Sequence, residues 1–102
     1  MSNTNTQIGM TIYQQLGGVN RLAIMAGCKN FCVGEKGVQF KVGSNSKKVT
    51  HCTIELDPSD TYTVKFFNIR GTNIQVLKEL NDIYDDMLIN VFETNTGMYL
   101  SL

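Results

Sequence analysis

The chain has 102 residues, 42% of them hydrophobic, so it is long enough for one compact domain and too short for two. Nine basic and nine acidic side chains cancel, which excludes a net field that would draw the whole molecule to nucleic acid or to an anionic membrane. No apolar run approaches the ~20 residues of a membrane span, so we expect no membrane association.

The first nine residues are small and polar and lack periodicity, so residues 1–9 are interpreted as a flexible N-terminal extension. They have neither the basic start nor the apolar stretch of a secretory signal, which predicts a cytoplasmic protein. Three cysteines, an odd number, fit reduced thiols better than a disulfide framework. Residues 10–102 are expected to form a single domain.

The domain is predicted to begin with two short helical pieces. Ile12 and Leu16 have helical spacing in the first piece, and Gly17-Gly18 interrupt it. Asn20 is a good N-cap for the second piece, which should end near Gly27. The two glycines could also hold an anion before a helix, but the lysine and Ser/Thr of a P-loop are missing, which favours a helix break.

Three alternating runs then predict an antiparallel β-meander. Apolar side chains occupy every second position of each run, the period of a half-buried strand. These positions are Val38, Phe40 and Val42, then Cys52, Ile54 and Leu56, and finally Tyr62, Val64 and Phe66. The connections are too short for parallel crossovers, and residues 57–60, which include Pro58, predict a turn.

Residues 72–96 are predicted to form one long amphipathic helix. Apolar residues recur there at spacings of three and four, namely Leu77, Leu80, Tyr84, Met87, Leu88 and Val91. A sheet with one apolar face needs such a helix as a cover, so Leu80 and Met87 should lie in the core. The predicted fold is a single α+β domain of order α-β-β-β-α. N-terminal helical segments precede a three-stranded antiparallel meander, and the long C-terminal helix packs on the sheet.

Catalytic and metal chemistry find little support in the sequence. Cys28, Cys32, His51 and Cys52 are soft ligands, but His51 and Cys52 should face opposite sides of a strand, which argues against a zinc site. A catalytic dyad of His51 with Cys28 or Cys32 is an alternative, although no motif supports it. We therefore predict no catalytic residues, no metal, no cofactor and no enzyme activity.

Charge is distributed unevenly along the chain. Residues 1–70 hold eight basic and four acidic side chains, whereas residues 71–102 hold one basic and five acidic. Neutralisation within one domain explains this asymmetry. Two binding surfaces are the alternatives, a basic sheet face for single-stranded nucleic acid and an acidic helix face that mimics phosphate charge toward a protein. The nucleic-acid candidates are Lys41, Lys65 and Arg70, and the acidic candidates are Asp82, Asp85, Asp86 and Glu93.

Six segments after residue 9 carry a family resemblance. They are residues 10–18, 20–21, 27–31, 57–62, 69–71 and 96–102. Together they resemble a family of small proteins from phages, prophages and other mobile elements of bacteria, although Val19 interrupts a tighter Gly-Gly-Asn-Arg run. The resemblance implies a non-enzymatic accessory protein in the host cytosol that binds a bacterial host protein or complex, in defence or DNA metabolism. Single-stranded nucleic-acid binding is the alternative function, and a homo-oligomer is compatible with both.

Overall fold

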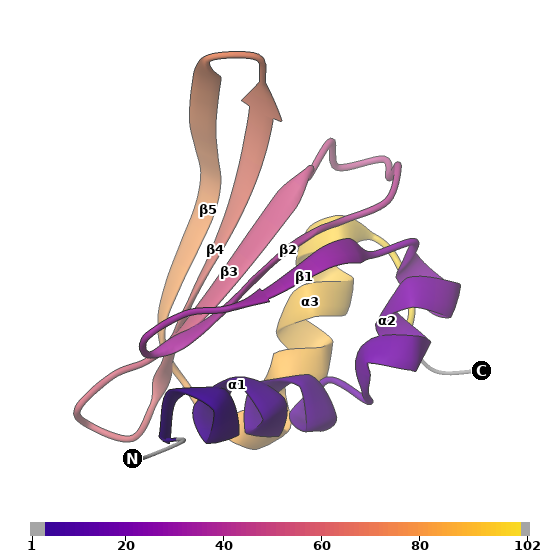
Figure 1. The fold of residues 1–102 in the computed structure, drawn as a ribbon. Helices are drawn as coiled ribbons and strands as arrows, with labels where there is room; N and C mark the ends of the chain where they lie inside the picture. The colour runs from indigo at the N-terminus through magenta and orange to yellow at the C-terminus, as the bar shows by residue number, and fades with distance from the viewer. Residues whose placement is uncertain (1–3, 101–102) are drawn as a thin grey trace.

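The computed structural model describes residues 4–100, in which three α-helices pack on one face of an antiparallel sheet (Figure 1). In chain order the elements are α1 (Thr4–Gln15), α2 (Val19–Ala26), β1 (Lys29–Val33), β2 (Gly37–Lys41), β3 (His51–Leu56), β4 (Tyr62–Arg70), β5 (Asn73–Ile83), η1 (Asp85–Met87) and α3 (Leu88–Thr96). The strands lie in the order β1-β2-β3-β4-β5, so each pairs with its neighbour in sequence. The α+β class and the C-terminal helix are confirmed. The prediction of three strands is wrong, because the sheet has five.

Strand register explains why one sheet face is apolar. Two cross-strand rows form this face, Val38–Ile54–Val64 and Phe40–Cys52–Phe66. All six side chains are at most 3% exposed. The three alternating runs are therefore confirmed as β2, β3 and β4, and Cys52 lies on the apolar face as its spacing predicts.

Phe40 is the centre of an aromatic cluster that joins the helices to the sheet. Its ring centroid lies 6.0 Å from that of Tyr13 in α1, 5.9 Å from that of Phe31 in β1 and 6.1 Å from that of Phe92 in α3. Tyr13 also meets Phe31 edge to face at 5.4 Å. Such aromatic pairs each contribute about 0.5–1.5 kcal/mol beyond the burial of their area. The cluster therefore fixes α1 and α3 on β1 and β2.

Helix α1 begins earlier than the sequence suggests. It starts at Thr4, so residues 4–9 of the expected extension are helical, and residues 1–3 lie outside the described part of the chain. Gly9 is buried, and a Cβ there would lie 2.7 Å from a Val33 methyl group. This close approach of helix to strand makes the segment before Met10 part of the fold.

Glycines delimit the two N-terminal helices as predicted. Gly17 and Gly18 separate α1 from α2 with φ values of +102° and +99°. Gly27 ends α2 in the left-handed conformation and donates its N–H to the Leu22 carbonyl oxygen. The expected N-cap was wrong by two positions, since Gly18 rather than Asn20 precedes the first helical residue.

The prediction of one helix over residues 72–96 is wrong. The first half of this segment is the strand β5, and only its last nine residues form α3. The two elements are joined by η1, a single 3-10 turn. Leu80 is half-buried against the core, but Met87 remains exposed.

A register shift near the end of β5 gives two of its core-facing residues a helix-like spacing. Leu80 lies opposite Val64 and Ile83 lies opposite Tyr62, so both face the core although they are three residues apart. Asp82, between them, has a φ of +58°. A bulge of this kind inserts an extra residue and converts the period of two into a spacing of three.

Candidate nucleic-acid interface

The sheet face without helices carries a continuous strip of basic and aromatic side chains. Each member lies directly opposite the next on neighbouring strands, in the order Lys29, Lys41, His51 and Phe67. Strands lie about 4.8 Å apart, so the strip spans roughly 14 Å from β1 to β4. It therefore presents two ammonium groups, an imidazole and a phenyl ring in one line.

Two grooves lie where the β2–β3 loop approaches the β4–β5 hairpin, and Lys29 and Lys41 of the strip line the first of them. The basic residues that line the first are Lys29, Lys41, Lys48 and Arg70, and those that line the second are Lys47, Lys48 and Arg70. Lys48 and Arg70 belong to both grooves. Over residues 4–100, five of the nine basic side chains line these grooves and no carboxylate does. This end of the sheet is therefore strongly positive although the chain is neutral.

Hydrogen bonds hold the lysine-bearing loop in place. The Asn45 side-chain amide donates to the Val49 carbonyl oxygen at 2.7 Å, and its Oδ1 accepts the Val49 N–H at 3.0 Å. The Asn68 side chain on β4 donates to the Lys48 carbonyl oxygen at 2.7 Å. The backbone of the loop is thereby fixed beside β4 before any ligand binds.

His51 is oriented by the residue before it. Its Nδ1 lies 2.9 Å from Thr50 Oγ1, which accepts the Ile69 N–H at 2.8 Å. Partial burial, together with the positive charge of Lys41, lowers the pKa of His51 below its usual 6.5. The imidazole is therefore neutral at pH 7, and a nearby phosphate would favour its charged form.

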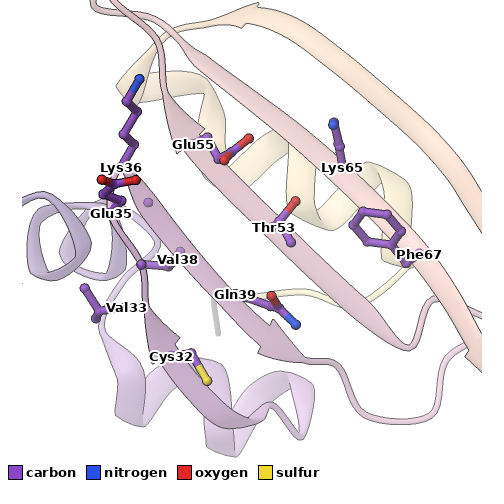
Figure 2. Close-up of a pocket in the computed structure, with 12 residues that line it drawn as sticks. Cys32, Val33, Glu35, Lys36, Val38, Gln39, Thr53, Glu55, Lys65 and Phe67 are labelled. Atoms are coloured by element: carbon purple, nitrogen blue, oxygen red, sulfur yellow. The ribbon is translucent and has the colours of Figure 1, made fainter. Parts of the chain in front are cut away.

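A third groove crosses the open face further from the basic loop (Figure 2). Figure 2 shows Cys32 and Phe67 on opposite sides of this groove, with Gln39 and Thr53 between them. Lys65 lies opposite Thr53 in β3 and opposite Glu79 in β5, so a carboxylate is close to its charge. The groove has mixed charge, in contrast to the two basic grooves.

The structure thus brings two of the three nucleic-acid candidates together. Lys41 and Arg70 line one groove, and Lys65 lies on the same face, two residues before Phe67. Sequence reasoning missed the basic contributors Lys29, Lys47 and Lys48 and the ring of His51. The adjacent lysines in a loop rich in Gly, Ser and Asn were an available signal for the loop contribution.

The acidic candidates do not share a helix face. Asp82 lies in β5, Asp85 and Asp86 lie in η1, and only Glu93 lies in α3. The Glu93 carboxylate accepts the Leu100 N–H at 2.8 Å, and the Leu100 side chain is buried. The expected acidic helix face was therefore wrong, and Glu93 has a structural contact instead.

All three cysteines carry free thiols. Cys28 and Cys52 are buried, whereas Cys32 is exposed. Burial raises the pKa of Cys28 to about 12 and raises that of Cys52 as well, so both thiols are protonated at neutral pH. Within residues 4–100, no three His, Cys, Asp or Glu side chains come together as potential metal ligands.

No family model, no characterised protein and no solved structure matches the chain. None of the three helices in the described part of the chain is long and apolar enough to cross a membrane.

Proposed function

We propose that the protein binds single-stranded nucleic acid along the basic strip of its open sheet face and around the adjoining end of the sheet, where Arg70 and the loop lysines lie. The supporting observation is the strip from Lys29 to Phe67, together with the adjoining groove that Lys29 and Lys41 share with Lys48 and Arg70 and that no carboxylate lines. Lys41, Arg70 and the loop lysines would contact phosphates, while the rings of His51 and Phe67 offer surfaces for base stacking. Stacking on an aromatic side chain contributes about 1–3 kcal/mol per base.

The arrangement favours a single strand over a duplex. Bases in a duplex are stacked on one another and cannot reach a ring on a sheet face. Duplex readers commonly place a helix in the major groove, yet α1 and α3 contain no basic residue and α2 contains only Arg21. The basic surface belongs to strands and a loop, as in proteins that bind extended single strands.

The number of basic groups sets the expected salt dependence. Five lysine and arginine side chains line the two grooves. If three to five phosphates are neutralised, the logarithm of the affinity should fall with the logarithm of salt concentration with a slope of about −2 to −3.5. A moderate affinity that weakens steeply with salt is therefore expected.

A fluorescent single-stranded oligonucleotide titrated at two salt concentrations tests this proposal. The double variant Lys41→Glu/Arg70→Glu should bind at least about tenfold more weakly, and its salt slope should become shallower by about 0.7 for each phosphate that is no longer neutralised. Phe67→Ala should weaken binding without changing the slope. Lys78→Glu is the matched control, because Lys78 is not part of the strip and lines neither basic groove.

Equal binding by Lys41→Glu/Arg70→Glu and the parent protein would contradict the proposal. So would a preference for a duplex of the same sequence. Loss of binding in the Lys78→Glu control to the same extent would show an unspecific charge effect and would also count against the strip.

Binding to a bacterial host protein or complex stays a second prediction, made from the family resemblance. The acidic helix that was expected to serve it does not form. The accessory role in a mobile element is compatible with nucleic-acid binding, which would place that role in DNA metabolism.

A further inference from the structure

Strand β5 forms an edge of the sheet, and its first four residues lack the usual protection of edge strands. No other strand of residues 4–100 pairs with its outer side, and the β4–β5 hairpin extends beyond the helices (Figure 1). Natural edge strands are usually protected by charges, prolines or bulges. Residues 73–76 contain neither charge nor proline, and they pair with β4 in unbroken register. Ile74 and Val76 are 67% and 52% exposed.

The hairpin loop determines which backbone groups point to this edge. Gly71 and Thr72 form a two-residue loop, with Gly71 at a φ of +57°, and Arg70 pairs with Asn73 to close it. The closing pair of such a hairpin exchanges hydrogen bonds, and hydrogen-bonded pairs alternate along the ladder. Ile74 and Val76 therefore direct their N–H and C=O groups away from β4, toward the open edge.

The same two residues belong to an apolar patch on the open sheet face. Ile74 lies opposite Ile69, and Val76 lies opposite Phe67. These four side chains make up the hairpin patch, and the two from β5 are mostly in water. An exposed apolar patch beside free strand groups is typical of an interaction surface.

We propose that β5 pairs in antiparallel fashion with β5 of a second copy of this chain, around a two-fold axis at Gln75. In this register Ile74 lies opposite Val76 of the second copy, so backbone groups that point to the edge meet each other. The hairpin patches of the two copies become one apolar surface, because a two-fold axis perpendicular to the sheet preserves its faces. Lys78 lies opposite Thr72, so no like charges are opposed.

Self-complementarity at Gln75 is what identifies the second copy as the occupant. A two-fold axis at Lys78 would oppose two ammonium groups. An axis at Val76 would place Ile74 against Lys78, and an axis at Ile74 would place Val76 against Thr72. Only the axis at Gln75 pairs the two exposed apolar residues with each other. The inference does not depend on nucleic-acid binding, because the dimer forms from the protein alone.

Sedimentation equilibrium from low micromolar to several hundred micromolar protein tests for the dimer, which should increase with concentration. Val76→Pro removes an N–H that points to the edge and is not needed by β4, a position where a strand tolerates proline. It should weaken association at least about tenfold. Ile24→Thr, which removes another exposed apolar side chain from α2, should leave association unchanged. A protein that is monomeric throughout, or a dimer unaffected by a folded Val76→Pro variant, would overturn the proposal.

Disulfide cross-linking tests the register and does not require the proline variant to fold. Opposed residues at a non-hydrogen-bonded antiparallel site have Cα atoms about 4.5 Å apart, within the range of a disulfide. Gln75→Cys, in a Cys32→Ser background that removes the exposed thiol, should therefore form a reducible dimer on mild oxidation. Asn81→Cys on the same strand should not, because it lies far from its counterpart in this register. Equal cross-linking at both positions, or none at Gln75→Cys, would contradict the pairing.

Discussion

Lys29 and Lys41 lie directly opposite each other on β1 and β2, on the open face of the sheet. Like charges in this position destabilise a sheet. An anion between the two ammonium groups would relieve their repulsion. The repulsion between the two lysines should therefore lower the stability of the free protein and favour the binding of a phosphate.

Replacement of one lysine by glutamate should separate these two effects. Lys29→Glu creates an opposite-charge pair with Lys41 and should raise the free energy of unfolding by about 0.2–1 kcal/mol. The same variant should bind a single-stranded oligonucleotide more weakly. Urea unfolding and fluorescence anisotropy measure the two effects, with Lys36→Glu, outside both basic grooves, as the control. A variant that loses both stability and binding would contradict the prediction.

His51 should couple both stability and binding to pH. Its pKa is lower in the folded protein than the usual 6.5, so the unfolded chain binds a proton more readily below that pH. Stability should therefore decrease as the pH falls below 6.5. A bound phosphate should raise the pKa of His51, so oligonucleotide affinity should increase over the same range.

The single histidine makes this prediction directly measurable. NMR titration of the one imidazole resonance, with and without oligonucleotide, should give a higher pKa in the complex. His51→Gln should remove the pH dependence of affinity between pH 5 and pH 8. An unchanged pKa in a saturated complex would place the ligand away from the strip.

Gly37 should tolerate no side chain. A Cβ there would lie 1.9 Å from the Ile54 carbonyl oxygen and 2.8 Å from the Glu55 Cα, both of them in the backbone of β3. Gly37→Ala should therefore lower the free energy of unfolding by more than about 2 kcal/mol. Gly34→Ala is the matched control, since its Cβ would meet its nearest neighbour at 3.8 Å and should change stability by less than about 0.5 kcal/mol. Similar unfolding midpoints for the two variants would contradict this prediction.

Alkaline pH should destabilise the protein because it deprotonates a buried tyrosine and a buried cysteine. Burial raises the pKa of Tyr13 from 10.0 to about 12 and that of Cys28 from 9.0 to about 12. The folded state thus holds protons that the unfolded state releases, so stability is complete below pH 9 and is lost as the pH rises toward 12. Tyr13→Phe should flatten this dependence, although it loses the 2.9 Å bond to the Cys32 carbonyl oxygen at neutral pH. Urea unfolding with reductant at a series of pH values tests both statements, and stability that does not change above pH 9 would contradict them.

The central strands could be predicted from sequence because a buried face leaves a strict alternation. Val38 and Phe40 in β2, like Cys52 and Ile54 in β3, face the helices from consecutive rows. The outer strands lack this signal. In β1, Asn30 has a φ of +56° and the register shifts between Lys29 and Cys32. The alternation of apolar and polar side chains is therefore interrupted within the five residues of β1.

The edge strand β5 and the basic strip both depend on how the strands pair with one another. Amino-acid composition does not determine that pairing. Ile69 and Ile74, on either side of the Gly71-Thr72 loop, were a hairpin signal that the three- and four-residue spacing further along the chain obscured. Lys41 was identifiable as a strand residue on the polar face. The position of Lys41 opposite Lys29 depends on the register of β1, which contains a bulge. The Lys29–Lys41 pair could therefore not be inferred from the sequence.

The meander also has a consequence for how the chain folds. Every strand pairs with the one before it, so the sheet can grow hairpin by hairpin through contacts that are close in sequence, a topology associated with fast folding. The aromatic core is different, because Phe92 from the last helix covers Phe40 from the second strand. The step that joins residues far apart in sequence is thus the docking of α3, which should limit the folding rate. Substitution of Phe92 should slow folding, whereas changes in the β4–β5 hairpin should mainly speed unfolding.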